Sequence, residues 1–268
     1  MLLAAPRDKG LHVFFVQRAE VTPEQTERIA FLRAGGQALL APEVRLLGDL
    51  GAWCRRAIHL QCAAGTDTLS LWRLGAAEVV GVDISDAMIA LAREKSAALD
   101  APAQWLQSDV LTTPHELDGT ADLVYTGKGA LNWLHDIDGW ARVVARLLAP
   151  GGRFYIFEGH PLTWIFEHAA PELRLDPRYG DYFSNRPEPD QGWPDEYIGE
   201  LSRPKTELAV KWERQWRFGE VMNALLAAGL RVEHFEEHPD AYWPQFPNLP
   251  QEIASKLPHT YSLLMRKG

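Results

Sequence analysis

Short apolar runs alternate with amphipathic stretches along the chain from Arg55 onward. The apolar runs are rich in β-branched and aromatic residues, which is typical of buried strands. We expect strands at residues 57–60, 78–82, 104–106, 122–125, 153–157, 230–235 and 260–265. Because amphipathic stretches of helical length separate most of these runs, the pattern predicts repeated strand-helix units and a doubly wound α/β sheet.

Helix signals stand between the predicted strands. Ser85 is suited to cap a helix over residues 85–99, and apolar side chains at helical spacing mark another over residues 140–148. Further helices are expected at residues 22–34, after Pro42, at 66–74 and at 218–228. The pattern predicts an N-terminal helical segment, residues 1–54, followed by one α/β domain, residues 55–268, with helices on both faces of the sheet.

Residues 160–217 break this alternation with proline, aspartate and many aromatic side chains. We interpret the segment as an insertion after the fifth strand that caps a substrate pocket, since aromatic rings supply rigid apolar walls. Packing of the same rings into a small core of their own, or into a homodimer contact, fits the pattern equally well. The role of the insertion therefore stays open at this point.

Composition and charge narrow the range of partners. The 268 residues carry a formal net charge of −9, and the sequence pI is about 5.5. An acidic chain repels phosphate backbones and anionic lipids, so neither a nucleic acid nor a membrane is expected as a partner. Cys54 and Cys62 alone give neither a disulfide framework nor a zinc site, and no metal is expected. Because no apolar run has the length of a signal or membrane segment, we expect a cytoplasmic protein.

Three features at predicted strand ends indicate nucleoside binding. The first strand runs through a turn of small residues, 62–65, into a helix whose N-terminal N–H groups suit an anionic group. Asp83 ends the second strand about 20 residues after that turn, at the place of an acid that accepts hydrogen bonds from ribose hydroxyls. Residues 108–110 follow the third strand, where the Asp109 carboxylate suits the adenine amino group.

These motifs resemble the class I methyltransferase family, and the resemblance covers roughly residues 55–158. It runs from the turn through Gly81-Val82-Asp83-Ile84-Ser85 to the Pro150-Gly151-Gly152 that precedes the fifth strand. The resemblance implies a seven-stranded, mostly parallel sheet with an antiparallel last strand. It also implies S-adenosyl-L-methionine as cofactor and S-adenosyl-L-homocysteine as product.

The resemblance, together with the strand-end pattern, assigns a set of candidate cofactor-binding residues. These are Gln61, Cys62, Ala63, Gly65, Asp83, Ile84, Met88, Ser108, Asp109, Val110, Tyr125 and Thr126. Gln61 and Ala63 occupy positions where the family carries turn glycines, and His59 stands where it carries an acid. A subgroup of small-molecule methyltransferases tolerates these changes, and we favour a structural His59 with a backbone partner.

The carboxyl ends of the fourth and fifth strands indicate where a methyl acceptor binds, because open α/β sheets hold ligands at this edge. Trp133, Glu158 and His160 follow or end those strands and are candidates for the acceptor pocket. Methyl transfer is an in-line displacement, so alignment and desolvation are the main tasks of the protein. Where the acceptor must lose a proton, His160, Tyr125, Glu158 and His135 are candidate bases, and the sequence does not choose among them.

The sequence therefore predicts an S-adenosylmethionine-dependent methyltransferase acting on a small molecule. A nicotinamide-dependent oxidoreductase is an alternative, since its sheet also uses a glycine turn and an acid after the second strand. Gln61 and Ala63 disfavour it, because a dinucleotide pyrophosphate needs glycine at such positions. A second alternative is a protein that binds the cofactor without transferring its methyl group.

Overall fold

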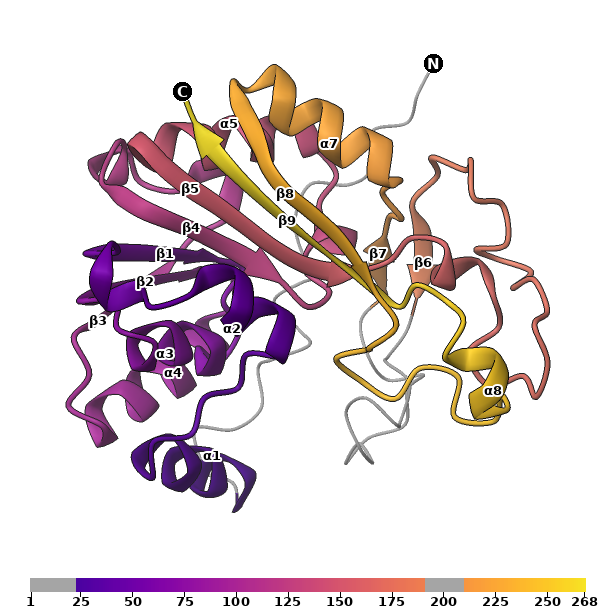
Figure 1. Cartoon of the computed structure of the whole chain (residues 1–268), viewed down its shortest axis with the longest axis horizontal. Coiled ribbons are helices and arrows are strands. Elements are labelled where there is room, and N and C mark those ends of the chain that lie inside the picture. Colours follow the sequence, from indigo (N-terminus) through magenta and orange to yellow (C-terminus); the bar gives the residue numbers. More distant parts are fainter. Residues whose placement is uncertain (1–22, 191–209) are drawn as a thin grey trace.

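The computed structural model describes residues 23–190 and 210–268. The first part of the predicted helical segment, residues 1–22, and the middle of the predicted insertion, residues 191–209, lie outside the described residues. Most of the described chain forms one mixed sheet with helices against both faces (Figure 1).

The strands follow the predicted apolar runs closely and are longer at several ends. They are β1 (Arg56–Leu60), β2 (Glu78–Asp83), β3 (Ala103–Gln107), β4 (Ala121–Gly127), β5 (Leu148–Gly159), β6 (Glu188–Asp190), β7 (Lys211–Glu213), β8 (Leu230–His238) and β9 (Thr260–Lys267). Only β6 and β7, which form a separate pair, have no counterpart among the predicted strands.

The helices also match most of the expected ranges. The α-helices are α1 (Pro23–Arg33), α2 (Ala41–Leu47), α3 (Thr66–Arg73), α4 (Asp86–Ala98), α5 (Ile137–Leu147), α7 (Phe218–Ala227) and α8 (Gln251–Ala254). Short 3-10 turns are η2 (Leu50–Ala52), η3 (Val110–Thr112), η4 (His115–Leu117), η5 (Leu131–Trp133) and η6 (Thr163–Ile165).

The main sheet has the strand order β3-β2-β1-β4-β5-β9-β8. Strands β1 to β5 pair in parallel, whereas β9 runs antiparallel to both β5 and β8. This confirms the prediction of a doubly wound sheet with an antiparallel last strand. The chain moves outward from β1 to β3 and then returns to place β4 on the other side of β1. The carboxyl ends of β1 and β4 therefore flank the topological switch point, where open sheets bind ligands.

Alternating side chains along β1 show how the two faces are covered. Ile58 and Leu60 pack with apolar residues of α5 and α7, whereas Ala57 packs with residues of α2 and α3 on the opposite face. Helix α4 contacts α3, β2 and β3. Burial on both faces explains why the parallel strands are nearly continuous apolar runs in the sequence.

Two of the differences from the expected boundaries concern α5 and β5. Helix α5 begins at Ile137, earlier than predicted, because the Asp136 side chain caps it by accepting the N–H of Gly139 at 2.8 Å. The Pro150-Gly151-Gly152 motif, expected between helix and strand, lies inside β5, where the pairing with β4 shifts register.

The described parts of the predicted insertion pack against a second segment, residues 239–259 between β8 and β9. Phe246 and Leu249 of this segment form an apolar cluster with Phe166, and the rings of His168 and Trp243 lie 4.7 Å apart. Strand β6 pairs antiparallel with β7. In Figure 1, β6, β7 and α8 lie together beyond the carboxyl end of β5. Two distant stretches of sequence thus build this side of the molecule.

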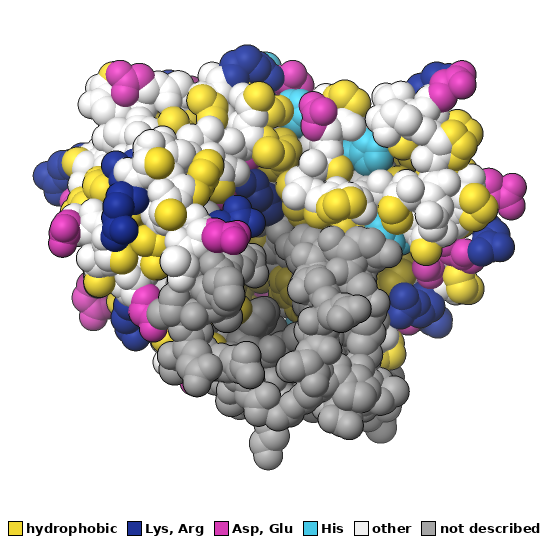
Figure 2. Space-filling view, turned by 90° about the horizontal axis from the view of Figure 1, so that it is seen from below, with side chains coloured by type: hydrophobic (Ala, Val, Ile, Leu, Met, Phe, Trp, Pro, Cys, Tyr) yellow, Lys and Arg dark blue, Asp and Glu magenta, His cyan; other side chains and the backbone are white. Residues whose placement is uncertain are grey.

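The surface carries both signs of charge. In the part of the face of Figure 2 that the structure describes, basic and acidic side chains are interspersed with apolar ones, without a broad patch of one sign. Among the described helices, none combines the length and the apolarity that a membrane crossing requires.

Candidate cofactor and acceptor site

The turn after β1 has the backbone of a glycine-rich turn although two of its residues are not glycine. Gln61, Ala63 and Gly65 have φ angles of 58°, 45° and 75°. The left-handed region is open to glycine at little cost, whereas other residues pay for the contact between Cβ and backbone. Gly65 is also needed for space, because a Cβ there would lie 2.4 Å from the ring of Trp105. Every second residue from Gln61 to Gly65 therefore has a left-handed backbone, although only Gly65 is a glycine.

Gln61 links the two strands at the switch point. Its side-chain Nε2 donates a hydrogen bond to the Ala130 carbonyl at 2.7 Å, so the end of β1 is tied to the loop after β4. Its Oε1 atom is buried and has no hydrogen-bond partner among the residues that the structure describes. A buried acceptor without a donor is unfavourable by about 1 to 3 kcal/mol. The atom is therefore suited to accept a hydrogen bond from a bound group such as an ammonium.

Asp83 lies at the end of β2 and faces this turn. One carboxylate oxygen accepts the N–H of Ala63 at 2.8 Å, and the other accepts the N–H of Ser85 at 2.9 Å. Burial raises the pKa of Asp83, and these N–H groups act in the opposite direction. An ionised carboxylate has about four acceptor positions. The half-buried side chain therefore keeps acceptor capacity for a donor such as a ribose hydroxyl.

The end of β3 brings a second acid to the same edge. The N–H of Ser108 donates to the Asp83 carbonyl at 2.9 Å, which places residues 108–110 beside the end of β2. One oxygen of Asp109 accepts the N–H of Leu111 at 2.9 Å, and the side chain is exposed. Val110 is buried at the start of η3. The two acids predicted from the sequence thus stand on adjacent strand ends, as expected.

The other candidate cofactor residues differ in access. Ile84 and Met88 are half-buried at the beginning of α4, beside Asp83. Cys62 and Thr126 are buried: the thiol of Cys62 belongs to the core cluster with Trp105, and the Thr126 hydroxyl donates to the Leu60 carbonyl at 3.1 Å. The side chains of Cys62 and Thr126 are therefore core groups.

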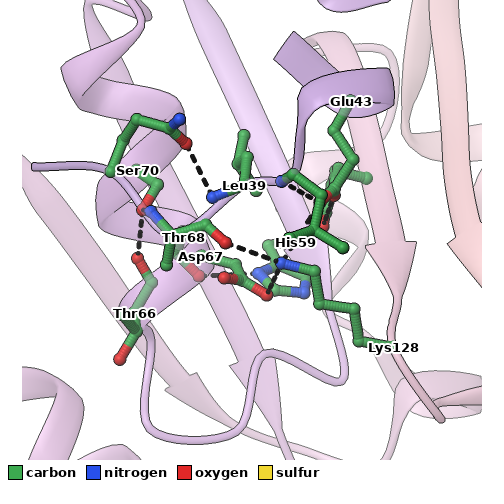
Figure 3. Close-up of polar contacts among 12 residues, drawn as sticks. Leu39, Glu43, His59, Thr66, Asp67, Thr68, Ser70 and Lys128 are labelled. Carbon is green, nitrogen blue, oxygen red and sulfur yellow. Dashed lines mark hydrogen bonds and ion pairs between the residues drawn. The ribbon is translucent and has the colours of Figure 1, made fainter. Parts of the chain in front are cut away.

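Tyr125 belongs to a buried polar network that the sequence did not indicate. Its hydroxyl donates to the Glu43 carboxylate at 2.5 Å, and that carboxylate lies 3.2 Å from the Lys128 ammonium. Figure 3 shows Lys128 directed between Glu43 and Asp67, whose carboxylate is 3.1 Å from the same nitrogen. Burial raises the pKa of Tyr125 well above its usual value. Tyr125 is therefore unsuited to act as a base, because its hydroxyl proton is bound by the Glu43 carboxylate inside the core.

His59 lies behind this network, at the position where the family carries an acid. Its Nδ1 is 2.8 Å from the Thr68 hydroxyl, and its ring meets Tyr125 edge-on with centroids 4.7 Å apart. Burial lowers the pKa of His59 to about 4, so the ring is neutral at physiological pH. The residue is structural, as we expected, although its partner is a side-chain hydroxyl and not the expected backbone group.

Glu158 fixes the loop that follows β4. Its carboxylate accepts the N–H groups of Gly129, Ala130, Leu131 and Gly159 at 2.5, 2.9, 3.2 and 2.8 Å. Burial raises the pKa of Glu158, and the four N–H groups counteract this effect. With so many donors the carboxylate serves as an anchor for the loop, which limits its use as a base.

His160 is a third candidate base, and both of its ring nitrogens have hydrogen-bond partners. Nδ1 accepts the N–H of Leu162 at 3.2 Å, and Nε2 lies 2.9 Å from a Glu237 carboxylate oxygen. Burial lowers the pKa of His160 below its usual range, and Glu237 opposes that shift. His135, by contrast, is exposed at the surface before α5. The geometry therefore does not favour His160 as a free proton acceptor.

A hollow opens beside the carboxyl end of β5. Its lining comes from η5, the end of β5, the start of β9 and the predicted insertion. The lining residues are Leu131, Asn132, Glu158, Gly159, Pro161, Trp164, Tyr179, Glu213, Arg214, Gln215, Trp216 and Tyr261. Of the three predicted acceptor residues, Glu158 lines this hollow. Trp133 instead contacts the Lys211 ammonium, 4.8 Å from its ring centroid.

The chain is similar to known methyltransferases. A model of a methyltransferase domain matches residues 57–152. A demethylmenaquinone methyltransferase of Thermus thermophilus is 36% identical over an alignment of 141 residues, and the match covers 46% of this chain and 63% of that protein. The chain thus spans less than two thirds of the curated relative that it matches.

Solved structures share the fold over most of the chain. An S-adenosylmethionine-dependent methyltransferase from Mesorhizobium loti has a TM-score of 0.57 and 24% identity, and covers 84% of this chain and 96% of its own. A putative enzyme of the same class from Listeria monocytogenes has a TM-score of 0.61 and 17% identity, and covers 84% and 95%. Residues 57–152 thus match a methyltransferase domain, and the fold that S-adenosylmethionine-dependent methyltransferases have extends over most of the chain, so the nicotinamide alternative loses its support.

Proposed function

We propose that this protein transfers the methyl group of S-adenosyl-L-methionine to a small-molecule acceptor. The observation that carries the proposal is the position of Asp83 and Asp109 at the ends of two neighbouring strands. Both ends lie beside a turn with three left-handed residues. An adenosine needs acceptors for its ribose hydroxyls and its amino group, and we assign the first to the Asp83 carboxylate and the second to the Asp109 carboxylate. Ile84, Met88 and Val110 lie next to these acids and would flank the base.

The residues of the slot suit the whole cofactor. Asp83 would accept the ribose hydroxyls, and Asp109 would accept the adenine amine. The buried Gln61 Oε1 is available for the ammonium of the methionine part, and the N–H groups at the start of α3 suit its carboxylate. When bound, the cofactor supplies a methyl group activated by a sulfonium centre. The task of the chain is to hold donor and acceptor in line and to exclude water.

The acceptor is proposed to bind in the hollow between η5, β5 and the insertion. Its aromatic lining suits an apolar or aromatic compound. The name of the Thermus thermophilus relative, a demethylmenaquinone methyltransferase, is consistent with an acceptor of this kind. In this proposal the insertion has the role of a substrate cap, completed by residues 239–259.

Incubation with radiolabelled S-adenosyl-L-methionine and a library of aromatic metabolites tests the proposal. We expect label to appear in a small acceptor, and Asp83→Ala to lower the rate at subsaturating cofactor. Cofactor binding without transfer to any acceptor would support the non-catalytic alternative. Binding of NADH without binding of S-adenosyl-L-homocysteine would overturn the proposal altogether.

A further inference from the structure

The backbone around Asn132 is held from two sides at the base of the hollow. Glu158 fixes the preceding residues by accepting the N–H groups of Ala130 and Leu131. The carbonyl of Asn132 itself accepts the N–H of Arg214, just after β7, at 2.9 Å. The residue therefore has a defined position between the main sheet and the insertion, and its side chain lines the hollow.

The side-chain amide of Asn132 is incompletely satisfied. Its Nδ2 and Oδ1 are both buried, and neither has a hydrogen-bond partner among the residues that the structure describes. Each such group is unfavourable, and native proteins seldom bury them without a reason. An amide that lines a pocket and lacks both a donor and an acceptor partner is suited to a ligand that supplies both.

Arg214 adds a second donor to the same hollow. Its Nε is buried without a partner among the described residues, whereas its Nη2 lies 3.3 Å from the Glu220 carboxylate. The guanidinium also lies over the ring of Trp216, 3.5 Å from its centroid, so its plane is fixed by stacking. The Nε–H group therefore has a fixed direction and no acceptor in the described part of the chain.

The remaining lining determines the kind of ligand that fits these groups. Trp164, Trp216 and Tyr261 provide aromatic walls, and the Glu158 carboxylate is already occupied by backbone donors. Full burial of a polar group is favourable only when its hydrogen bonds are made. A flat ring with a donor and an acceptor side by side would satisfy the Asn132 amide while the ring packs against the walls.

We propose that Asn132 determines acceptor specificity by pairing with a hydrogen-bond donor and acceptor carried side by side on an aromatic ring. A carboxamide, or a ring hydroxyl beside a carbonyl, has this pattern, and the Arg214 Nε–H would donate to the carbonyl oxygen. This inference rests on the proposed function, because it places the methyl acceptor in this hollow. A site built to pair with polar groups rejects analogues that lack them much more strongly than a purely apolar pocket does.

Benzamide and toluene are suitable probes, because they share a ring and differ in the donor-acceptor pair. Binding is measured by ligand-detected NMR titration of the full chain, with and without S-adenosyl-L-homocysteine. We expect the wild type to bind benzamide, and Asn132→Leu to weaken this binding at least about tenfold, as expected for one or two lost hydrogen bonds. Toluene binding should be unchanged or stronger in the variant, because the leucine side chain has the same branching as asparagine and is apolar.

Two further variants keep this test decisive. Asn223→Leu places the same change on the exposed face of α7 and should bind benzamide like the wild type. Asn132→Asp replaces the Nδ2 donor with a carboxylate oxygen and adds a negative charge. The benzamide carbonyl then loses a donor and faces an acceptor, so binding should weaken even if Asn132→Leu fails to fold. Equal benzamide affinity of the wild type and Asn132→Asp, or no binding by the wild type, would overturn the role of Asn132. Failure of the wild type to bind S-adenosyl-L-homocysteine would instead refute the proposed function.

Discussion

The buried His59 should make the folded protein sensitive to mild acid. Its folded-state pKa is about 4, because burial disfavours the charged ring, whereas a histidine in an unfolded chain titrates near pH 6.5. Between these values the unfolded chain binds a proton that the folded one does not. The free energy of unfolding is thus fully retained above about pH 6.5 and falls as the pH approaches 4.

The size of the effect follows from the gap between the two pKa values. Each pH unit within the gap lowers the free energy of unfolding by about 1.4 kcal/mol, which gives about 2 kcal/mol at pH 5 and about 3 kcal/mol at pH 4. His59→Asn keeps a polar partner for Thr68 but cannot take up the proton. Urea unfolding of both proteins between about pH 7 and pH 5 measures the difference, and subtraction removes the contributions of the other histidines.

The difference in unfolding free energy between wild type and His59→Asn should therefore shrink by about 2 kcal/mol over this range. A constant difference would show that His59 does not stay neutral in the folded state. In that case the ring would have access to water or to a compensating anion, and our view of it as a closed structural residue would be wrong.

Three other substitutions test the turn, the loop anchor and the second acid. Ala63→Gly should raise the free energy of unfolding by about 0.5 to 1 kcal/mol, because it relieves a left-handed alanine, and a lower thermal midpoint would contradict this. Glu158→Gln should lower the free energy of unfolding by about 3 kcal/mol, since an amide group would face backbone donors, and an unchanged urea midpoint would count against the anchor role. Asp109→Ala should weaken S-adenosyl-L-homocysteine binding less than Asp83→Ala, because water replaces an exposed contact, and the reverse order in calorimetry would contradict our assignment of the two acids.

The sheet could be predicted from the sequence because its determinants are local. Parallel strands buried on both faces leave continuous apolar runs, and caps such as Ser85 mark the helices between them. The acids at the ends of β2 and β3 follow from strand order, since the carboxyl ends of neighbouring parallel strands meet at one edge. The turn after β1 could be predicted from its small residues, but its left-handed backbone at Gln61 and Ala63 could not, because neither residue is a glycine.

The parts that could not be predicted depend on contacts between distant segments. The Glu43, Tyr125 and Lys128 network joins α2 to the end of β4, and each of these residues alone looks like an ordinary helix or strand residue. The segment 239–259 has no periodicity that assigns it to the insertion, yet Phe246 packs against Phe166. Asn132 gives no signal in the sequence, because its proposed role in acceptor binding depends on the burial of its amide without a partner in the described part of the chain.

Calorimetric titration with S-adenosyl-L-homocysteine tests the adenosine slot at the ends of β2 and β3 most directly. Asp86 is exposed on the first turn of α4, so Asp86→Ala is a matched control that should bind like the wild type. We expect saturable binding by the wild type, weakened by Asp83→Ala by about 1.5 to 3 kcal/mol, or roughly tenfold to a hundredfold. No binding by the wild type, or the same dissociation constant for Asp83→Ala, would contradict the proposed slot.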